Sequence, residues 1–313
     1  MTPMVTDDRV ARAEALLRAS CGDRLRAAFA LAPLTTFRIG GPAALYLEPE
    51  SDDDLDAVAA TVAATGIQVM VIGKGSNILV SDGGVHGLVL RLGRGYRWAA
   101  RDGDIVTAGG SMPLPALAGV ALRHGLAGLA FAVAIPATLG GAVRMNAGAH
   151  DGAMADVVTA VDVYRLSDPG RRRREATAMG FEYRHAELPD DAIVVGAAIR
   201  LRPGQDREIR AAMDEAREWR RMTQPLAEPN CGSVFTNPPG DHAARLIDGA
   251  GLKGHRVGGA RVSEKHANFI VAGPGATAAD VVSLIGVIRD LVLDRSGVEL
   301  TPEVRLIGEA ADA

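Results

Sequence analysis

The chain has 313 residues, of which 48% are hydrophobic, 4% are aromatic and 23% are charged, and its formal net charge is −4. One hydrophobic core rarely keeps growing at this length, so two or three domains are predicted, and a weakly acidic chain with few aromatic rings gives no reason to expect a nucleic-acid partner. Its two cysteines, Cys21 and Cys231, provide neither a disulfide framework nor a paired-cysteine metal site, so we expect a cytoplasmic protein that binds no metal.

Hydrophobic periodicity and turn residues predict mixed helices and strands along the first half of the chain. Helical spacing covers residues 8–31 with a break near Cys21 and Gly22, and the acidic start of a helix at 52–65 suits the dipole of its N-terminus. A further helix is expected at about 113–124. The expected strands lie at 35–42, 43–49, 68–72, 77–80, 86–92 and 104–109.

The second half of the chain repeats this mixture and adds one long charged helix. That helix, at about 205–222, carries arginine and glutamate at i, i+4 spacing and is interpreted as the start of another domain. The basic run 171–174 follows a turn and is interpreted as a solvated loop or a strand edge. Strands are expected at 156–166, 192–202, 255–262, 267–272 and 298–307, and helices at 241–250 and 277–296.

The stretch VIGKGSNILVSD, residues 71–82, is the most informative part of the chain. An apolar strand turns abruptly at Gly73–Asn77 and then becomes apolar again. Two glycines in three residues permit positive φ and close backbone approach, so consecutive N–H groups can converge on an anion such as a pyrophosphate. Glycine, serine and asparagine are also common turn residues, so an ordinary tight turn explains the stretch unless a second signal agrees.

A second signal lies at residues 131–149, FAVAIPATLGGAVRMNAGA, where Arg144 is the single charged residue. Pro136 and the glycines break this segment, which is too short to span a membrane, and we recognise no secretory leader at the N-terminus. We therefore expect the segment to be buried. It is interpreted either as the tightly packed start of a helix or as a wall of small residues against a large flat cofactor, and the turn upstream favours the wall.

Three polar residues in the later part of the chain are candidates for chemistry. Ser233, in the motif GSVF, is either a proton donor or a turn residue that opens a strand, and no nucleophile elbow surrounds it, which disfavours a hydrolase. Arg184 either clamps a carboxylate with its planar fork or ends a helix at the surface. Glu303 lies in an apolar run, where it is either held in its protonated form or paired with Arg305 at a strand edge.

Taken together and in order, these segments resemble one protein family, the UDP-N-acetylenolpyruvoylglucosamine reductases. The shared motifs run from about residue 34 to residue 308. They are TTFRIGGPA, GKGSNILVSD, IPATLGGA, MNAGA, YRH, GSVFTNP, VSEKHANFI and PEVRLIG. Each motif is short, but eight of them in this order are specific, and the chain is similar to the shorter form of the family.

The resemblance implies a multidomain α+β protein. Family members have FAD-binding domains similar to those of the vanillyl-alcohol oxidase, or PCMH, type, followed by a C-terminal α/β substrate-binding domain. We place an N-terminal helical segment at 1–32, the FAD-binding domain at 33–202 with subdomains at about 33–92 and 93–202, and the substrate domain at 203–313, whose last strand, at about 298–308, completes the active site.

The resemblance also implies a reaction. In this family NADPH reduces FAD, and a hydride then passes to C3 of the enolpyruvyl ether of UDP-N-acetylglucosamine enolpyruvate, giving UDP-N-acetylmuramate for peptidoglycan synthesis and hence for cell shape and division. By match to the family motifs, Ser233 donates a proton to C2, while Arg184 and Glu303 polarise the substrate carboxylate and stabilise the enol intermediate. Beside that carboxylate, Glu303 is expected to be protonated.

The same match implies the binding contacts. The FAD pyrophosphate is expected on Gly73, Lys74, Gly75, Ser76, Asn77 and Ile78, and the isoalloxazine against Ile135, Pro136, Thr138, Gly141 and Asn146. Asn237 and Asn268 are expected to bind the UDP-sugar. No G-x-G-x-x-G motif follows a strand and opens a helix, in agreement with a family in which NADPH uses the substrate site. We expect a monomer whose partners are small molecules, with no membrane or nucleic acid among them.

The chain departs from the family pattern at four positions. Ala137 replaces a glycine, His150 a tyrosine or asparagine, Ala186 a serine and Thr236 a lysine, the last of which removes a cation near the expected diphosphate. None of these is a catalytic candidate, so activity is expected while substrate affinity stays open. Two alternatives remain: another FAD-dependent oxidoreductase of the same cofactor fold, which has no need of the GSVFTNP motif, and a non-catalytic UDP-sugar sensor, which has no need of the three catalytic residues.

Overall fold

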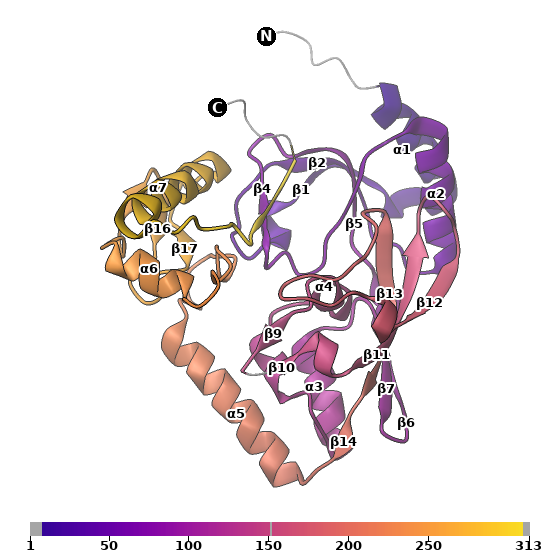
Figure 1. Ribbon diagram of the computed structural model, residues 1–313. Helices are drawn as coiled ribbons and strands as arrows, with labels where there is room; N and C mark the ends of the chain where they lie inside the picture. Colours follow the sequence, from indigo (N-terminus) through magenta and orange to yellow (C-terminus); the bar gives the residue numbers. More distant parts are fainter. Residues whose placement is uncertain (1–7, 151, 309–313) are drawn as a thin grey trace. The chain divides into compact units, whose positions relative to one another are not determined.

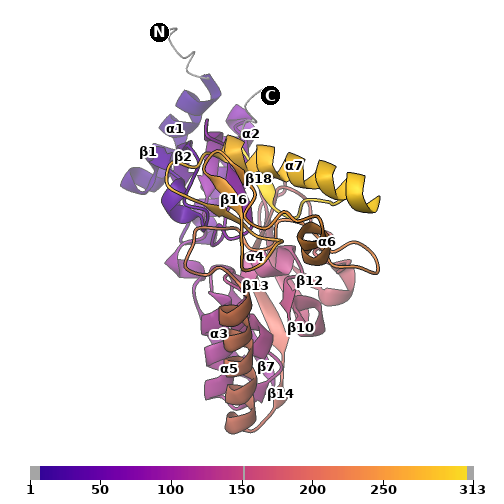
Figure 2. The same ribbon diagram turned by 90° about the vertical axis from the view of Figure 1, so that its left-hand side faces the viewer.

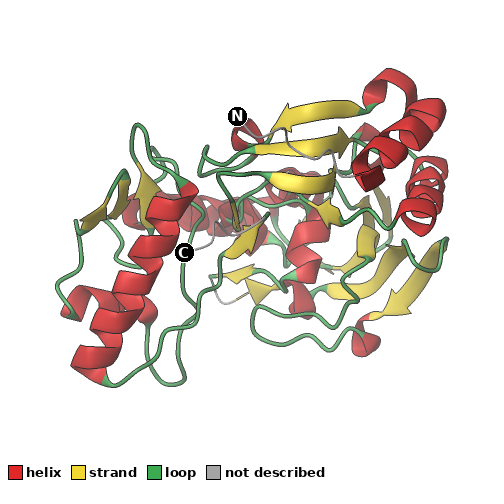
Figure 3. Ribbon diagram, turned by 90° about the horizontal axis from the view of Figure 1, so that it is seen from above, coloured by secondary structure: helices red, strands yellow, loops and turns green. Residues whose placement is uncertain are grey.

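The computed structural model describes residues 8–150 and 152–308, which divide into two compact units (Figure 1). The first unit contains residues 8–27, 45–74 and 87–219, and the second contains residues 28–44, 75–86 and 220–308. Both units are discontinuous because the chain passes repeatedly between them, and the contiguous domain ranges remain a prediction. Helices and strands occur in both units (Figure 3), which confirms the expected α+β class.

A five-stranded antiparallel sheet is the centre of the first unit, with strand order β12-β11-β13-β7-β6. Its strands are β6 (Ala99–Asp102), β7 (Ile105–Gly109), β11 (Val158–Arg165), β12 (Arg171–Glu175) and β13 (Ala192–Arg200). β13 is buried along all but its last residue because β11 and β7 flank it and the short helix α4 (Leu139–Arg144) packs on it. The basic run is the edge strand β12, as one of its two interpretations predicts.

A four-stranded sheet with order β1-β2-β5-β3 adjoins a second core. Its strands are β1 (Arg26–Ala30), β2 (Pro42–Leu47), β3 (Val69–Val71) and β5 (Val85–Leu90), and the chain changes unit within β1, β2 and β5. Helices α1 (Asp8–Cys21) and α2 (Asp52–Thr65) pack on each other and bury Leu17 and Leu55 with leucines of the sheet. Ser51 caps the start of α2 by accepting from the Asp54 N–H, and Gly66 ends it with φ +66, so local signals set both ends.

Two further helices complete the core of the first unit. Helix α3 (Leu114–Arg123) and the long helix α5 (Asp206–Thr223) place Leu117 and Met213 in one apolar cluster with the strands of the five-stranded sheet. Two short antiparallel pairs adjoin them: β8 (Leu126–Ala127) with β14 (Arg202–Pro203), and β9 (Gly148–Ala149) with β10 (Gly152–Ala153).

The second unit is built around a small sheet and one long helix. Strands β15 (Arg256–Val257), β16 (Ala260–Val262) and β17 (Ile270–Ala272) form an antiparallel sheet. Helix α7 (Ala278–Ser296) packs on β15 and β16, and Figure 2 shows it beside β16. Helix α6 (Ala243–Gly249) contacts α7. Strand β4 (Ile78–Val80) pairs in parallel with β18 (Arg305–Ile307), so a strand near residue 80 is joined to the C-terminal strand.

Two predictions of secondary structure are wrong for tertiary reasons, and the strand expected at 298–307 is confirmed only at 305–307. Residues 26–30 form β1 rather than the end of a helix, because β2 is available to pair with them. Residues 35–41 form a loop rather than a strand, since the Thr36 N–H bonds to the Gly75 carbonyl and the Gly41 N–H to the Ser81 carbonyl. In the part of the chain that the structure describes, no helix has the length and apolar character needed to cross a bilayer.

Candidate active site

The GKGSN turn lies between β3 and β4, where the chain leaves the first unit after Lys74. On the first-unit side, Gly73 approaches Thr138 so closely that a Cβ at Gly73 would lie 2.6 Å from the threonine hydroxyl oxygen. On the second-unit side, Gly75 has φ +62, and a Cβ there would collide with the carbonyl oxygen of Leu34. Close approach and backbone conformation therefore require both glycines.

The end of this turn is bound to the last strand of the second unit. Asn77 donates from Nδ2 to the Glu303 carbonyl oxygen at 3.2 Å, and the Asn77 carbonyl accepts from the Arg305 N–H at 3.1 Å. Ile78 then pairs with Arg305 in the register of β4 and β18. The structure thus brings the predicted cofactor turn next to the predicted catalytic Glu303, a proximity that no sequence pattern indicated.

The apolar segment folds into a 3-10 turn (Ala130–Ala134) and the helix α4, whose N-cap is Thr138. Gly140 lets α4 pack closely on the sheet, because a Cβ there would lie 2.8 Å from the Val194 carbonyl oxygen. At Gly141 a Cβ would meet only the Thr138 hydroxyl oxygen, at 3.4 Å. The packed helix start therefore describes this segment at Gly140, while a wall of small residues against a cofactor stays a prediction at Gly141.

The φ of Ala137 lies outside the positive region, so the methyl group that replaces the family's glycine needs no strained backbone. Ile135 is half-buried and packs against the core, whereas Pro136 is exposed. Their contact with an isoalloxazine stays a prediction.

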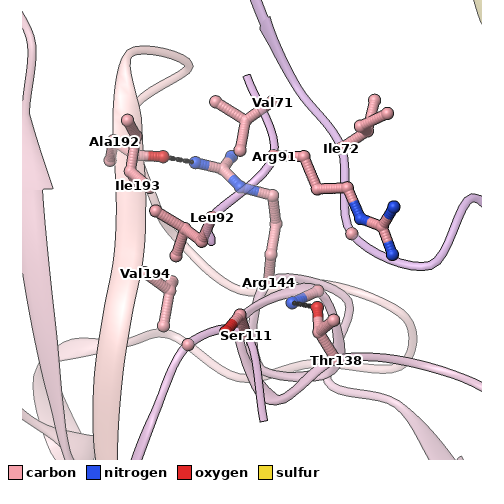
Figure 4. A pocket seen from close by; sticks show the side chains of 14 residues that line it. Val71, Ile72, Arg91, Leu92, Ser111, Thr138, Arg144, Ala192, Ile193 and Val194 are labelled. Carbon is pink, nitrogen blue, oxygen red and sulfur yellow. Dashed lines mark hydrogen bonds between the residues drawn. The ribbon is translucent and has the colours of Figure 1, made fainter. Parts of the chain in front are cut away.

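Gly141 also lines a cavity of the first unit, shown in Figure 4. Gly73 and Thr138 line it too, so three of the predicted cofactor residues meet there. The remaining lining residues are Val71, Ile72, Arg91, Leu92, Gly110, Ser111, Gly140, Arg144, Ala192, Ile193 and Val194. Of these, Gly140 and Arg144 belong to the apolar segment already interpreted as a cofactor wall. Sequence reasoning missed the glycine–serine pair 110–111 directly after β7, although it carries the same signal as the GKGSN turn.

Arg144, the one charged residue of the apolar segment, has its role in this cavity wall. Its Nη2 donates to the carbonyl oxygen of Pro189 at 3.0 Å and to that of Ala192 (Figure 4). The guanidinium therefore ties the end of α4 to the first residue of β13.

Arg184 is presented at the tip of a two-residue turn in the first unit, not at the end of a helix. Glu182 and His185 exchange backbone N–H to carbonyl bonds, each of 3.1 Å, with Tyr183 and Arg184 between them. Arg184 has φ +58, a conformation that costs a residue with a side chain about 1–2 kcal/mol. Its Nη1 donates to the Gly148 carbonyl at 3.1 Å, and its guanidinium lies 5.3 Å from the centroid of the Tyr183 ring. Strained residues of this kind cluster at functional sites.

Asn146 holds the base of that turn. Its Nδ2 donates to the Glu182 carbonyl at 2.8 Å, and its Oδ1 accepts from the Ala155 N–H at 2.9 Å. The side chain is buried and the residue has φ +39, which asparagine tolerates better than most residues. The structure therefore places this predicted cofactor residue beside the predicted catalytic arginine, and its contact with a flavin stays a prediction.

Ser233 and Glu303 lie on neighbouring backbone segments of the second unit. The Glu303 N–H donates to the carbonyl oxygen of Val234, the residue after Ser233, at 2.7 Å. Both candidates are half-buried. The second unit thus brings together two of the three predicted catalytic residues from opposite ends of its C-terminal segment, while Arg184 belongs to the first unit.

Cys231 precedes Ser233 by two residues and is buried. Burial raises the pKa of its thiol, and the nearby Glu303 carboxyl group raises it further. A neutral buried thiol is a poor nucleophile, so the serine hydroxyl is the better candidate for chemistry in this segment.

The two asparagines expected to bind substrate have protein partners. Oδ1 of Asn237 accepts from the N–H of Ala243, the first residue of α6, at 3.1 Å. Asn268 is buried, and its amide bonds to the backbone of Phe235. Substrate contacts of both residues stay predictions.

The departures from the family pattern are accommodated locally. The ring of His150 packs edge-on against Trp219 with centroids 4.7 Å apart. Ala186 is buried, where a serine hydroxyl would need a hydrogen-bond partner. The Thr236 hydroxyl donates to the Thr301 carbonyl at 3.2 Å, so this residue reinforces the backbone next to Ser233.

Two family models match the chain. One describes an FAD-binding domain and matches residues 43–168, and the other describes the C-terminal domain of UDP-N-acetylenolpyruvoylglucosamine reductase and matches residues 224–307. The glycine-lined cavity of the first unit lies in a region that the FAD model largely covers, and together they define the chain as an FAD-binding protein.

Relatives specify the family. The UDP-N-acetylenolpyruvoylglucosamine reductase of Heliobacterium modesticaldum is 50% identical over 279 residues, which cover 88% of each chain. The enzyme of that name from Anaeromyxobacter dehalogenans (strain 2CP-C) is 47% identical over 92% of this chain and 87% of its own. The crystal structure of UDP-N-acetylenolpyruvylglucosamine reductase from Thermus caldophilus matches with a TM-score of 0.77 and 37% identity, over 88% of this chain and 97% of that one. The chain belongs to the UDP-N-acetylenolpyruvoylglucosamine reductase family and is an FAD-dependent oxidoreductase.

The residues of the first unit fit this cofactor. At Gly73, Gly140 and Gly141 the cavity wall is bare backbone, and at the first two positions a side chain would collide with the structure. Arg91, Ser111 and Thr138 add polar groups to the same wall. A large cofactor with a flat ring and phosphates suits such a surface, because small residues admit the ring while backbone and cationic groups meet the phosphates.

Proposed function

We propose that the protein reduces UDP-N-acetylglucosamine enolpyruvate to UDP-N-acetylmuramate with NADPH. The observation that carries this proposal is the 2.7 Å bond from the Glu303 N–H to the Val234 carbonyl, which sets the Ser233 segment beside Glu303. The reaction needs a proton donor and a group that stabilises an enol on the same substrate, and these two residues can supply them. Relatives that carry the name of this reductase add support at 50% and 47% identity.

The bound FAD supplies hydride transfer between NADPH and the substrate. Once a hydride has added to C3 of the enolpyruvyl group, an electron pair at C2 is shared with the adjacent carboxylate. Ser233 donates its hydroxyl proton to C2, which forms the new C–H bond, and the serine recovers a proton from solvent. A serine hydroxyl is a weak acid, so this step needs a strongly basic carbon and a fixed geometry that excludes water.

Arg184 and Glu303 act on the substrate carboxylate. The guanidinium stays charged at any working pH and offers two parallel donors that match a carboxylate, so Arg184 stabilises the charge that develops there. An ionised Glu303 would repel the same group, and we therefore expect Glu303 to be protonated in the substrate complex and to donate a hydrogen bond to the enol. A titration of the complex that finds Glu303 ionised at neutral pH would contradict this assignment.

The setting of the reaction is part of the proposal. UDP-N-acetylmuramate is a precursor of peptidoglycan, so the protein would serve cell-wall synthesis, and through it cell shape and division. We propose that it works in the cytoplasm as a monomer with small-molecule partners.

The experiment that tests the proposal separates the two half-reactions. Purified protein should be yellow, lose its colour with NADPH under anaerobic conditions and regain it when UDP-N-acetylglucosamine enolpyruvate is added. Ser233→Ala should leave reduction by NADPH intact and slow reoxidation by the substrate about 10²- to 10⁴-fold, because only the second step needs the proton. Normal reoxidation of the variant would reject Ser233 as the donor. A colourless protein that cannot be loaded with FAD would favour the sensor instead.

A further inference from the structure

Asn268 makes an unusually complete set of bonds to the segment that follows Ser233. Its Oδ1 accepts from the Phe235 N–H at 2.9 Å and its Nδ2 donates to the Phe235 carbonyl at 2.8 Å, so one side chain satisfies both backbone groups of one residue. The Asn268 carbonyl also accepts from the Val234 N–H at 2.9 Å. Only 4% of Asn268 is exposed, which leaves its amide little surface for a UDP-sugar.

The other edge of the same segment is held by the residues around Glu303. The Val234 carbonyl accepts from the Glu303 N–H, and the Thr236 N–H donates to the Thr301 carbonyl at 3.0 Å. Residues 234–236 therefore pair with the backbone of residues 301–303 on one side. On the other side they pair with the Asn268 carbonyl at Val234 and with the Asn268 side-chain amide at Phe235, and we call this arrangement the ladder. Among the strands of residues 8–150 and 152–308, none pairs with Phe235 on the Asn268 side, so the amide takes the place of a neighbouring strand there.

We propose that Asn268 is a positioning residue for the proton transfer: through Phe235 it fixes the backbone that carries Ser233 beside Glu303. This inference rests on the proposed function. Without the amide, two buried backbone groups would have no partner and the segment would shift to find water, because an unpaired buried donor or acceptor is costly. A displacement of about 1 Å at a reacting group can cost about 100-fold in rate.

The test uses the full-length protein loaded with FAD and two variants. Asn268→Asp keeps the shape of the side chain and an acceptor for the Phe235 N–H, and it removes the donor to the Phe235 carbonyl; Asn268→Ala removes both bonds. Val292→Ala is the matched control, because it truncates a fully buried side chain of α7 in the same unit and removes none of the hydrogen bonds of the ladder. Unfolding transitions select conditions in which every variant is folded.

Both variants should be reduced by NADPH at the rate of the control, and their reoxidation by saturating UDP-N-acetylglucosamine enolpyruvate should slow about 10- to 100-fold with the substrate Kd unchanged. In heavy water, the wild-type product should carry deuterium at C2 in one configuration, whereas the variants should give a mixture because water reaches C2 from either face.

Reoxidation within twofold of the control, or a weaker Kd with an unchanged saturating rate, would reject the positioning role; the second outcome would return Asn268 to the substrate contacts. If Asn268→Ala does not fold, the Asn268→Asp measurement decides alone. A wild-type protein that is reduced by NADPH but never reoxidised by this substrate would instead reject the proposed reaction, and this role with it.

Discussion

The Arg184 turn of the first unit and the Ser233–Glu303 ladder of the second present catalytic candidates in opposite ways. Arg184 stands at the tip of a tight turn with φ +58, where its backbone is strained by about 1–2 kcal/mol. Ser233 and Glu303 lie on neighbouring segments whose backbone groups bond to each other, and neither residue has a positive φ. The turn thus presents its guanidinium at a cost in stability, because the Arg184 backbone is strained. The ladder is stabilised by the same backbone hydrogen bonds that position Ser233 and Glu303.

A buried asparagine supports each arrangement. Asn146 bonds to the Glu182 carbonyl at the base of the turn, and Asn268 bonds to Phe235 in the ladder. An amide suits both places, since it is the neutral side chain that offers a donor and an acceptor together. In both units a buried amide therefore holds the backbone that carries a catalytic candidate, whether that backbone is strained or not.

In the turn, the largest effect is expected at Arg184. Arg184→Ala and Arg184→Gly should both lower the rate of substrate reduction about 10²- to 10³-fold, because a preorganised donor to the developing charge is lost. Yet Arg184→Gly should be more stable than Arg184→Ala by about 1 kcal/mol, because glycine adopts positive φ without a side-chain clash. Steady-state rates and urea unfolding measure the two effects.

The neighbouring residue provides the control for this pair. Tyr183 is 60% exposed and its φ is not positive, so Tyr183→Gly should be less stable than Tyr183→Ala by about 0.5–1 kcal/mol. If glycine and alanine rank in the same order at both positions, the backbone at Arg184 is not strained.

Removing the Asn146 amide at the base of the turn should lower activity less than the Arg184 variants do, and it should lower stability more. Asn146→Ala leaves the Glu182 carbonyl and the Ala155 N–H without a side-chain partner, so we expect a loss of about 2–3 kcal/mol in the free energy of unfolding. Thr159→Val removes one bond of 3.3 Å in the same unit and should cost about 1 kcal/mol or less. Equal losses for the two variants would show that Asn146 is no special anchor of the turn.

Two adjacent glycines sharpen the contrast between close packing and open space in the first unit. Gly140→Ala places a methyl group 2.8 Å from the Val194 carbonyl oxygen and should destabilise the protein by about 1–3 kcal/mol. Gly141→Ala meets only a hydroxyl oxygen at 3.4 Å, so stability should change little while FAD affinity falls, because the methyl group enters the cavity. Thermal unfolding of the apoprotein and fluorescence titration with FAD separate the outcomes. A Gly141→Ala protein with unchanged FAD affinity would place the cofactor elsewhere.

The smallest effect is a pH dependence in the second unit. Nδ1 of His266 accepts from the Asn268 N–H at 3.3 Å, and burial, then the charge of Lys253, lowers the pKa of His266 below its ordinary 6.5. As pH falls below about 6.5, this histidine takes up a proton in the unfolded chain before it does so in the folded protein. The free energy of unfolding therefore decreases progressively below that pH, until the histidine of the folded protein is protonated as well. Urea unfolding from pH 7.5 to 5 should show this loss, and His266→Gln should remove that part of it. Parallel pH profiles for the two proteins would contradict the assignment.

Local signals predicted much of the fold. The helix expected at 52–65 is α2 at the same residues, because Ser51 and Gly66 act within a turn of its ends. Likewise, the long charged helix and the helix at 277–296 appear within a residue or two of their expected bounds. The eight ordered motifs predicted the family, and with it the FAD cofactor, because a motif is recognised from the identity of neighbouring residues and needs no tertiary structure.

Other features depended on partners that are distant in the chain. Residues 26–30 continue a helical pattern but pair with β2, and Glu303 meets the Ser233 segment only through the folding of the second unit. The bonds of Asn146 to the Glu182 carbonyl and of Asn268 to Phe235 could not be predicted either, because in the sequence both asparagines lie in family motifs and are interpreted as ligand contacts. A periodic sequence pattern predicts which residues are buried and which lie in turns. A long-range hydrogen bond instead depends on which groups tertiary packing brings within about 3 Å of each other.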